Sequence, residues 1–111
     1  MDTLSQYQTI IYQVLNEYAQ IPYSYGELER RFIMSEDKNS YLLITLGWQG
    51  DQRVHGCLVH LEIKDDKIWI QRDGTEDGIA DELVRAGIPK QQIVLGFQPL
   101  EIRPYTEYAV N

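Results

Sequence analysis

The chain has 111 residues, of which 43% are hydrophobic and 24% are charged, and its formal net charge is −7 with a pI of about 4.7. This length fits one domain, and the apolar fraction is large enough for a packed core, which argues against intrinsic disorder. No run of about 18 apolar residues occurs, so no membrane-spanning helix is predicted. We therefore expect a single domain over residues 1–111.

Cysteine usage and the N-terminal sequence bear on the compartment in which the protein resides. Cys57 is the single cysteine of the sequence, which excludes an internal disulfide bond and suits a reducing compartment. No basic segment followed by an apolar run opens the sequence, so no secretory signal is predicted. These observations favour the cytoplasm.

The acidic balance bears on the class of partner. Affinity for nucleic acids comes largely from Lys and Arg side chains that contact phosphates. Arg30 and Arg31 form the one adjacent basic pair, and on a strand their side chains would point to opposite faces. Direct DNA binding is therefore disfavoured and a protein partner is the better prediction. The alternative is that the charge only keeps the protein soluble.

The first half of the sequence predicts a helix followed by two strands. Between Thr3 and Gln20, apolar residues recur at helical spacing, as in a helix that packs one face on a core. Alternation predicts a strand near Glu27–Met34, and polar residues predict a loop over Ser35–Ser40. Tyr41–Trp48 carries apolar residues on both faces, which favours a central strand. The helical stripe comprises Leu4, Tyr7, Ile11, Val14, Leu15 and Tyr18.

A second hairpin is predicted from the β-rich runs Arg53–Ile63 and Lys67–Gln71, with a turn at Asp65 and Asp66. A two-residue turn fixes the register. The face that should receive a helix carries the pairs Ile63 with Ile68 and Leu61 with Ile70, and it extends to Val59 and Cys57. The opposite face carries His60, Glu62, Trp69 and Gln71.

A second helix is predicted at roughly Thr75–Ala86. Gly74 can turn the chain with a positive φ, and Thr75 is a suitable N-cap. Gly87 stands where a left-handed C-cap is needed, so that Ile88 folds back onto Leu83. Pro89 can open another helical turn.

These elements predict an α+β fold: an antiparallel four-stranded meander with the N-terminal helix and the helix after the last strand packed on one face. Prolines and aromatic residues in the segment 97–111 predict an extended segment pinned to the domain.

Candidate chemistry was sought among the histidines, the cysteine and the carboxylates. His55 and Cys57 should share a strand face with His60 on the other, so we expect no metal site, and core packing of Cys57 is favoured over a nucleophilic role. The dipole at a helix N-terminus explains much of the acidic cluster, and Asp81 can pair with Arg85. We expect no catalytic, metal or cofactor-binding residues. The acidic cluster comprises Asp73, Glu76, Asp77, Asp81 and Glu82.

The sheet face opposite the helices is the predicted surface for a partner or for self-association. Trp is enriched at interface hot spots, and Trp69 is the aromatic residue of this surface. The alternative is that Trp69 packs under the C-terminal segment. The predicted surface comprises His60, Glu62, Trp69 and Gln71.

The run KIWIQRDGTEDGIADELVRAGIPKQQIVLGF resembles the XisI family, the fdxN element excision controlling factor proteins of cyanobacteria. GW at residues 47–48, RVHG at 53–56 and RPYT at 103–106 agree with it, and the similarity extends over nearly the whole chain. The resemblance implies an accessory factor for programmed excision of a DNA element during heterocyst differentiation, in which a separate site-specific recombinase cuts and joins the strands. An XisH-like protein, similar to nuclease folds, would be the partner.

The function predicted on this basis is a non-enzymatic control factor that acts through protein contacts and also forms homo-oligomers. The alternatives are a direct DNA-binding regulator, a non-catalytic subunit of a nuclease-like complex, or an enzyme that uses the acidic cluster with a divalent cation.

Overall fold

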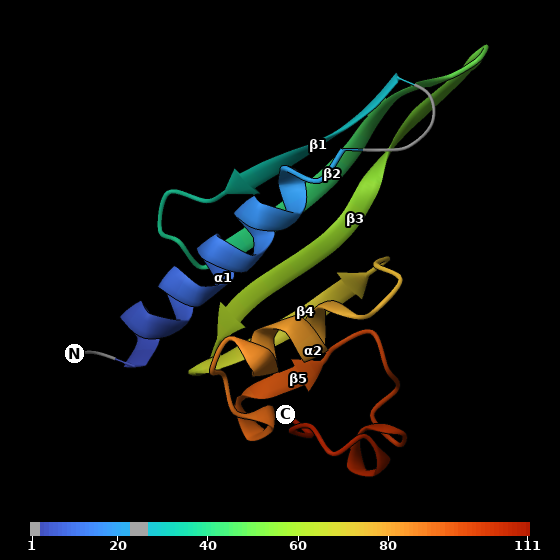
Figure 1. The fold of residues 1–111 in the computed structure, drawn as a ribbon. Helices are drawn as coiled ribbons and strands as arrows, with labels where there is room; N and C mark the ends of the chain where they lie inside the picture. Colours follow the sequence, from blue (N-terminus) through green and yellow to red (C-terminus); the bar gives the residue numbers. More distant parts are fainter. Residues whose placement is uncertain (1–2, 23–26) are drawn as a thin grey trace.

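A computed structural model describes residues 3–22 and 27–111 and shows an α+β fold, in which two helices lie on one side of a twisted sheet (Figure 1). Residues 23–26, for which the sequence predicts a turn or loop between the first helix and the first strand, lie outside the described residues. No helix of the described ranges is long and apolar enough to cross a membrane. The elements are α1 (Thr3–Ala19), β1 (Glu27–Met34), β2 (Ser40–Gln49), β3 (Gln52–Lys64), β4 (Lys67–Asp73), α2 (Ile79–Arg85), the 3₁₀ turn Lys90–Gln92, β5 (Ile93–Leu95) and the 3₁₀ turn Arg103–Tyr105.

Among the described residues the sheet has five strands in the order β1-β2-β3-β4-β5, so the prediction of four strands was wrong. The first four form the expected antiparallel meander. The fifth strand pairs parallel to β4, because α2 carries the chain back along the sheet before β5 begins. Three residues are too few to show an alternating pattern, which explains why β5 was missed.

The core lies between the helices and one face of the sheet, as predicted. Tyr7, Ile11 and Leu15 of α1 are buried, and they belong to one cluster with buried residues of β2, β3 and β4. Ile79 and Leu83 of α2 complete this cluster and are fully buried. Burying an Ile or Leu side chain contributes about 1.5–3 kcal/mol, so these stripes account for the position of both helices.

The hairpin between β3 and β4 has the predicted register. Lys64 lies opposite Lys67, and Ile63 lies opposite Ile68. Asp65 and Asp66 have φ values of 54° and 63°, the left-handed conformation that a two-residue hairpin turn of the primed type requires. Because this turn leaves no freedom in the pairing, it decides which side chains face the helices in the part of β3 and β4 next to it, as far as the register shift between His60 and Leu61.

A bulge in β3 corrects the predicted face of Cys57, whereas His60 lies on the face that was predicted for it. The register between β2 and β3 shifts after Leu43, so that Cys57 lies opposite Ile44 and not in the row of Val59. Residues directly opposite each other share a face, and Ile44 points away from the helices. His60, opposite Leu42, points to that same side. Cys57 is therefore not a core residue.

The C-terminal ends of α2 and of the described chain are fixed as predicted. Gly87 has a φ of 116°, and the N–H of Ile88 donates to the carbonyl of Leu83 at 3.1 Å, which is the expected C-cap. Further on, the N–H of Ala109 donates to Ile93 at 2.9 Å. The segment after β5 is thus pinned to the edge of the sheet as predicted, but it is built of turns, including the 3₁₀ turn Arg103–Tyr105, and is not extended.

Gly47 supports a testable prediction about the pairing of β1 with β2. Its φ is 143°, and a Cβ at this position would overlap the carbonyl oxygen of Glu27. We expect Gly47→Ala to lower the free energy of unfolding by roughly 1 kcal/mol or more, because backbone strain alone costs about 1–3 kcal/mol. Gly56→Ala is the matched control, because a Cβ there meets open space. Urea denaturation measures both, and equal stability of the two variants would contradict the prediction.

Tyr41 supports a prediction about alkaline pH. Its side chain is fully buried and its hydroxyl donates to the Lys38 carbonyl at 2.6 Å. Burial, with the nearby charge of Asp37, raises the pKa of Tyr41 to about 12 from an ordinary value of 10. The fold favours the protonated phenol, so this stabilisation is complete below pH 10 and is lost as the pH rises toward 12.

We expect Tyr41→Phe to cost about 1 kcal/mol at neutral pH and to flatten the fall in stability above pH 10. Urea denaturation between pH 7 and pH 11.5 measures this, with Tyr105→Phe, at an 84% exposed residue, as the control. An unchanged slope in Tyr41→Phe would show that other groups control alkaline unfolding.

Candidate functional site

The acidic turn before α2 is a structural element. Asp73 Oδ1 accepts hydrogen bonds from the backbone N–H and the hydroxyl of Thr75 at 2.9 and 2.6 Å. Its Oδ2 accepts from the N–H of Ile79, the first residue of α2, at 2.7 Å. The carboxylate of Asp73 therefore holds the turn and satisfies a free N–H at the start of the helix.

Two predictions about this turn were wrong. Helix α2 begins at Ile79 and not at Thr75, because Asp73 closes the turn over six residues, and no local sequence pattern shows such a contact. Thr75 accepts a hydrogen bond from the N–H of Gly78 at 3.2 Å, before the helix starts. The positive φ falls on Gly78, at 88°, and not on Gly74.

Two other carboxylates of the predicted acidic cluster, Asp81 and Glu82, make separate surface contacts. Arg85 pairs with Glu82 at 2.7 Å and not with Asp81 as predicted. The hydroxyl of Tyr108 donates to Asp81 at 3.4 Å. Within residues 3–22 and 27–111, no group of three or more His, Cys, Asp or Glu side chains could hold a metal ion.

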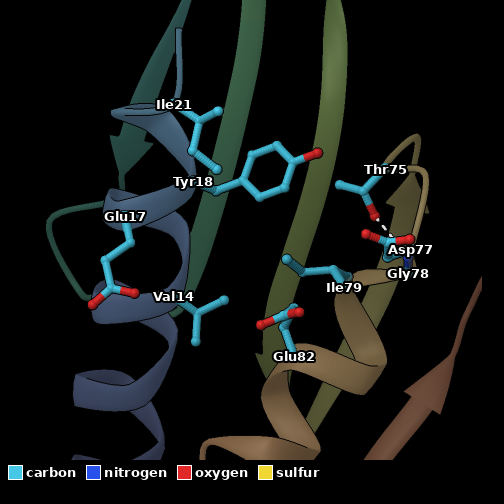
Figure 2. A pocket seen from close by; sticks show the side chains of 9 residues that line it. All are labelled: Val14, Glu17, Tyr18, Ile21, Thr75, Asp77, Gly78, Ile79 and Glu82. Atoms are coloured by element: carbon cyan, nitrogen blue, oxygen red, sulfur yellow. Dashed lines mark hydrogen bonds between the residues drawn. The ribbon is translucent and has the colours of Figure 1, made fainter.

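A groove of about 440 Å³ separates the C-terminal half of α1 from the start of α2 (Figure 2). Its apolar lining comes from both helices, and Figure 2 shows Val14 and Tyr18 on one side with Ile79 on the other. Glu17, Asp77 and Glu82 supply the charged part of the lining. The groove thus lies on the acidic, helical side of the molecule.

Cys57 lies in a half-buried position, and its thiol donates to the carbonyl of Val59 at 3.3 Å. Burial raises the pKa of the Cys57 thiol, while the charge of Arg72 and the contact with Val59 act in the opposite sense. A raised pKa keeps the thiol protonated near neutral pH, which disfavours nucleophilic attack.

The predicted partner surface occupies one region of the face that points away from the helices, which we call the open face. Trp69 lies opposite Glu62, and His60 lies opposite Arg72. Gln71 Nε2 donates to Glu62 Oε1 at 3.1 Å. Each of the four predicted residues is partly exposed. The structure thus brings them together, but it does not test their role.

The ring of Trp69 is partly covered by the C-terminal segment, the alternative that the sequence left open. The guanidinium carbon of Arg103 lies 5.4 Å from the ring centroid, and Lys64 Nζ lies 5.1 Å from it. Arg103 also donates to the carbonyls of Gln98 and Val110, at 3.1 and 3.3 Å. Two cations therefore already contact the Trp69 ring.

An apolar stripe on the open face was not predicted as a site. The outward side chains of an antiparallel strand are commonly polar, yet those of β2 from Leu42 to Trp48 are apolar. The alternation of residues 41–48 already showed apolar groups on both faces, but it was interpreted only as a central position in the sheet. The apolar stripe comprises Leu42, Ile44, Leu46 and Trp48 of β2, together with Ile33 of β1, which lies opposite Leu42.

Comparison with known proteins identifies the family. The family described as XisI protein matches residues 1–110. The chain belongs to the XisI family. A XisI-like protein from Anabaena variabilis has a crystal structure with a TM-score of 0.87 and 39% identity, covering 97% of this chain and 99% of that one. None of the curated proteins compared with this chain matches it.

A second crystal structure is that of the fdxN element excision controlling factor XisI from Anabaena variabilis. Its TM-score is 0.82 at 35% identity, and the match covers 99% of this chain and 100% of that one. The similarity to XisI proteins predicted from the sequence is thus confirmed over the whole domain.

Asp73 supports a prediction that separates a structural carboxylate from a solvated one. We expect Asp73→Ala to lower the free energy of unfolding by about 1–3 kcal/mol, because three donors lose their acceptor. Asp77→Ala, at an exposed carboxylate in the same turn, is the control and should change stability by less than about 0.5 kcal/mol. Thermal or urea denaturation measures both, and a neutral Asp73→Ala would contradict the capping role.

Proposed function

We propose that this XisI-family chain is a non-enzymatic accessory factor that controls programmed excision of a DNA element, and that it acts through contacts with an XisH-like protein. The observation that carries the proposal is the full-length similarity to the protein named as the fdxN element excision controlling factor. In this role the recombination chemistry belongs to a separate recombinase.

The state of the reactive side chains supports a role without catalysis. The carboxylate of Asp73 is occupied by three hydrogen bonds within its own turn. The pKa of the Cys57 thiol is raised, which is opposite to what a nucleophile needs. Asp73 therefore serves the fold, and Cys57 is poorly suited to nucleophilic attack.

The open face supports action through protein contacts. The predicted surface around Trp69 and the apolar stripe lie on this same face, and Ile33 and Trp48 are 49% and 46% exposed. Contiguous exposed apolar patches mark interaction sites on proteins. We therefore place the partner surface, including His60, Glu62, Trp69 and Gln71, on the open face.

Binding of the XisH-like protein from the same genome tests this proposal. We expect the two purified proteins to form a complex that elutes as one species in size-exclusion chromatography at micromolar concentration. Multi-angle light scattering of the chain alone separates this complex from self-association. The absence of a complex at that concentration, or cleavage of DNA by the chain alone in Mg²⁺, would contradict the proposed role.

A further inference from the structure

We infer that the apolar stripe of the open face is the docking site for a protein surface that combines apolar side chains with carboxylates. This inference rests on the proposed function, since it specifies which part of the open face the partner contacts and what chemistry the partner offers. Three observations carry it: the apolar character of the stripe, the sign of the charges beside it, and the arrangement of those charges.

The stripe runs along β2, which lies between β1 and β3 in the sheet. Leu42, Ile44 and Leu46 alternate with the core residues Tyr41 and Leu43 and point to the opposite side. They are partly exposed, and among the described elements both helices lie on the other face. The C-terminal segment lies against Trp69 on β4. The side chains of β2 therefore stay accessible to a partner.

Next to the stripe, β3 and β4 carry the cations Arg53 and Arg72 on the open face, together with the carboxylate of Glu62, which accepts a hydrogen bond from Gln71. Arg53 lies opposite Trp48, and His55 lies opposite Leu46. His60 lies opposite Leu42, and Arg72 of β4 lies opposite His60. The acidic groove between α1 and α2 is on the other side of the sheet. A chain with a net charge of −7 thus presents a locally basic rim, which complements carboxylates.

The arginines of this rim are held in place by backbone contacts. Arg72 Nε donates to the carbonyl of Cys57 at 2.8 Å. Arg53 donates to the carbonyl of Gly47 at 3.4 Å and lies 5.5 Å from the centroid of the Trp48 ring. On the β1 side, Arg31 pairs with Glu29 at 2.8 Å, so that edge is mixed in charge. Partner carboxylates are therefore expected along β3.

The composition of the stripe favours a protein over the other possible occupants. Single-stranded nucleic acids bind sheets through bases stacked on aromatic rings, whereas this stripe is aliphatic apart from Trp48. The ring of Trp69 is already contacted by Lys64 and Arg103. A second copy would bring the same basic rim, so face-to-face pairing would oppose like charges.

The test measures binding of the purified XisH-like protein to charge-reversing variants by isothermal titration calorimetry. Ile33→Asp places a carboxylate at an apolar, 49% exposed position of the stripe, and Arg53→Glu reverses the exposed rim charge. We expect each substitution to raise the Kd at least about tenfold, as for residues near the centre of an interface. The Kd of the wild-type complex should also rise as the NaCl concentration increases.

Matched controls lie on the helical side. Ile21→Asp alters an apolar residue of similar exposure, 52%, and Arg85→Glu alters a cation that is 70% exposed. We expect both to bind within about twofold of the wild type, since such surface changes act only near the interface. Circular dichroism melts verify folding, and Arg53→Glu carries the test alone if Ile33→Asp does not fold.

The outcomes separate this inference from the function on which it rests. Absence of a wild-type complex overturns both. A complex that Ile33→Asp and Arg53→Glu leave intact, or that only Ile21→Asp weakens, overturns the inference and leaves the function standing. Binding of a 20-nucleotide single-stranded DNA that Arg53→Glu abolishes assigns the face to nucleic acid. A homodimer in sedimentation velocity that Ile33→Asp dissociates assigns it to a second copy. Both of these results overturn the inference.

Discussion

Packing of both helices on one face of the sheet is the interaction on which the rest of the structure depends. Ile11 and Leu15 of α1, together with Ile79 and Leu83 of α2, meet the inward side chains of β2, β3 and β4 in one fully buried cluster. Since no helix of the described ranges covers the second face, many of the side chains there remain accessible to a partner. The division also separates charge, with carboxylates around the groove between the helices and cations along β3 on the open face.

Much of the fold could be predicted because local sequence and tertiary packing agree. The turn at Asp65 and Asp66 specifies the register of β3 and β4, and the stripe of α1 specifies which side meets the core. Gly87 with Ile88 predicts the end of α2, and the hydrogen bond from Ile88 to Leu83 has the expected geometry. At these positions each residue type has few conformations open to it, so the pattern has one interpretation.

The incorrect predictions arose where a contact between residues distant in sequence, or a single extra residue in a strand, changed the local structure. The bulge at Leu58, between Cys57 and Val59, reverses the direction of Cys57. Asp73 delays the start of α2 because its carboxylate accepts a hydrogen bond from the N–H of Ile79. β5 is a strand only because it pairs with β4. The stripe on β2 was visible as a pattern, but its exposure depended on which face the helices occupy.

The parallel pairing of β4 with β5 has a consequence for the order of folding events. The four antiparallel strands are joined by short turns, so each contact closes a small loop and costs little chain entropy. Joining β5 requires that the turn held by Asp73, the helix α2 and the 3₁₀ turn at Lys90–Gln92 be placed first. We expect this crossover to be the slow step, with the meander and α1 formed earlier and the unit from α2 onward opening first in native-state hydrogen exchange.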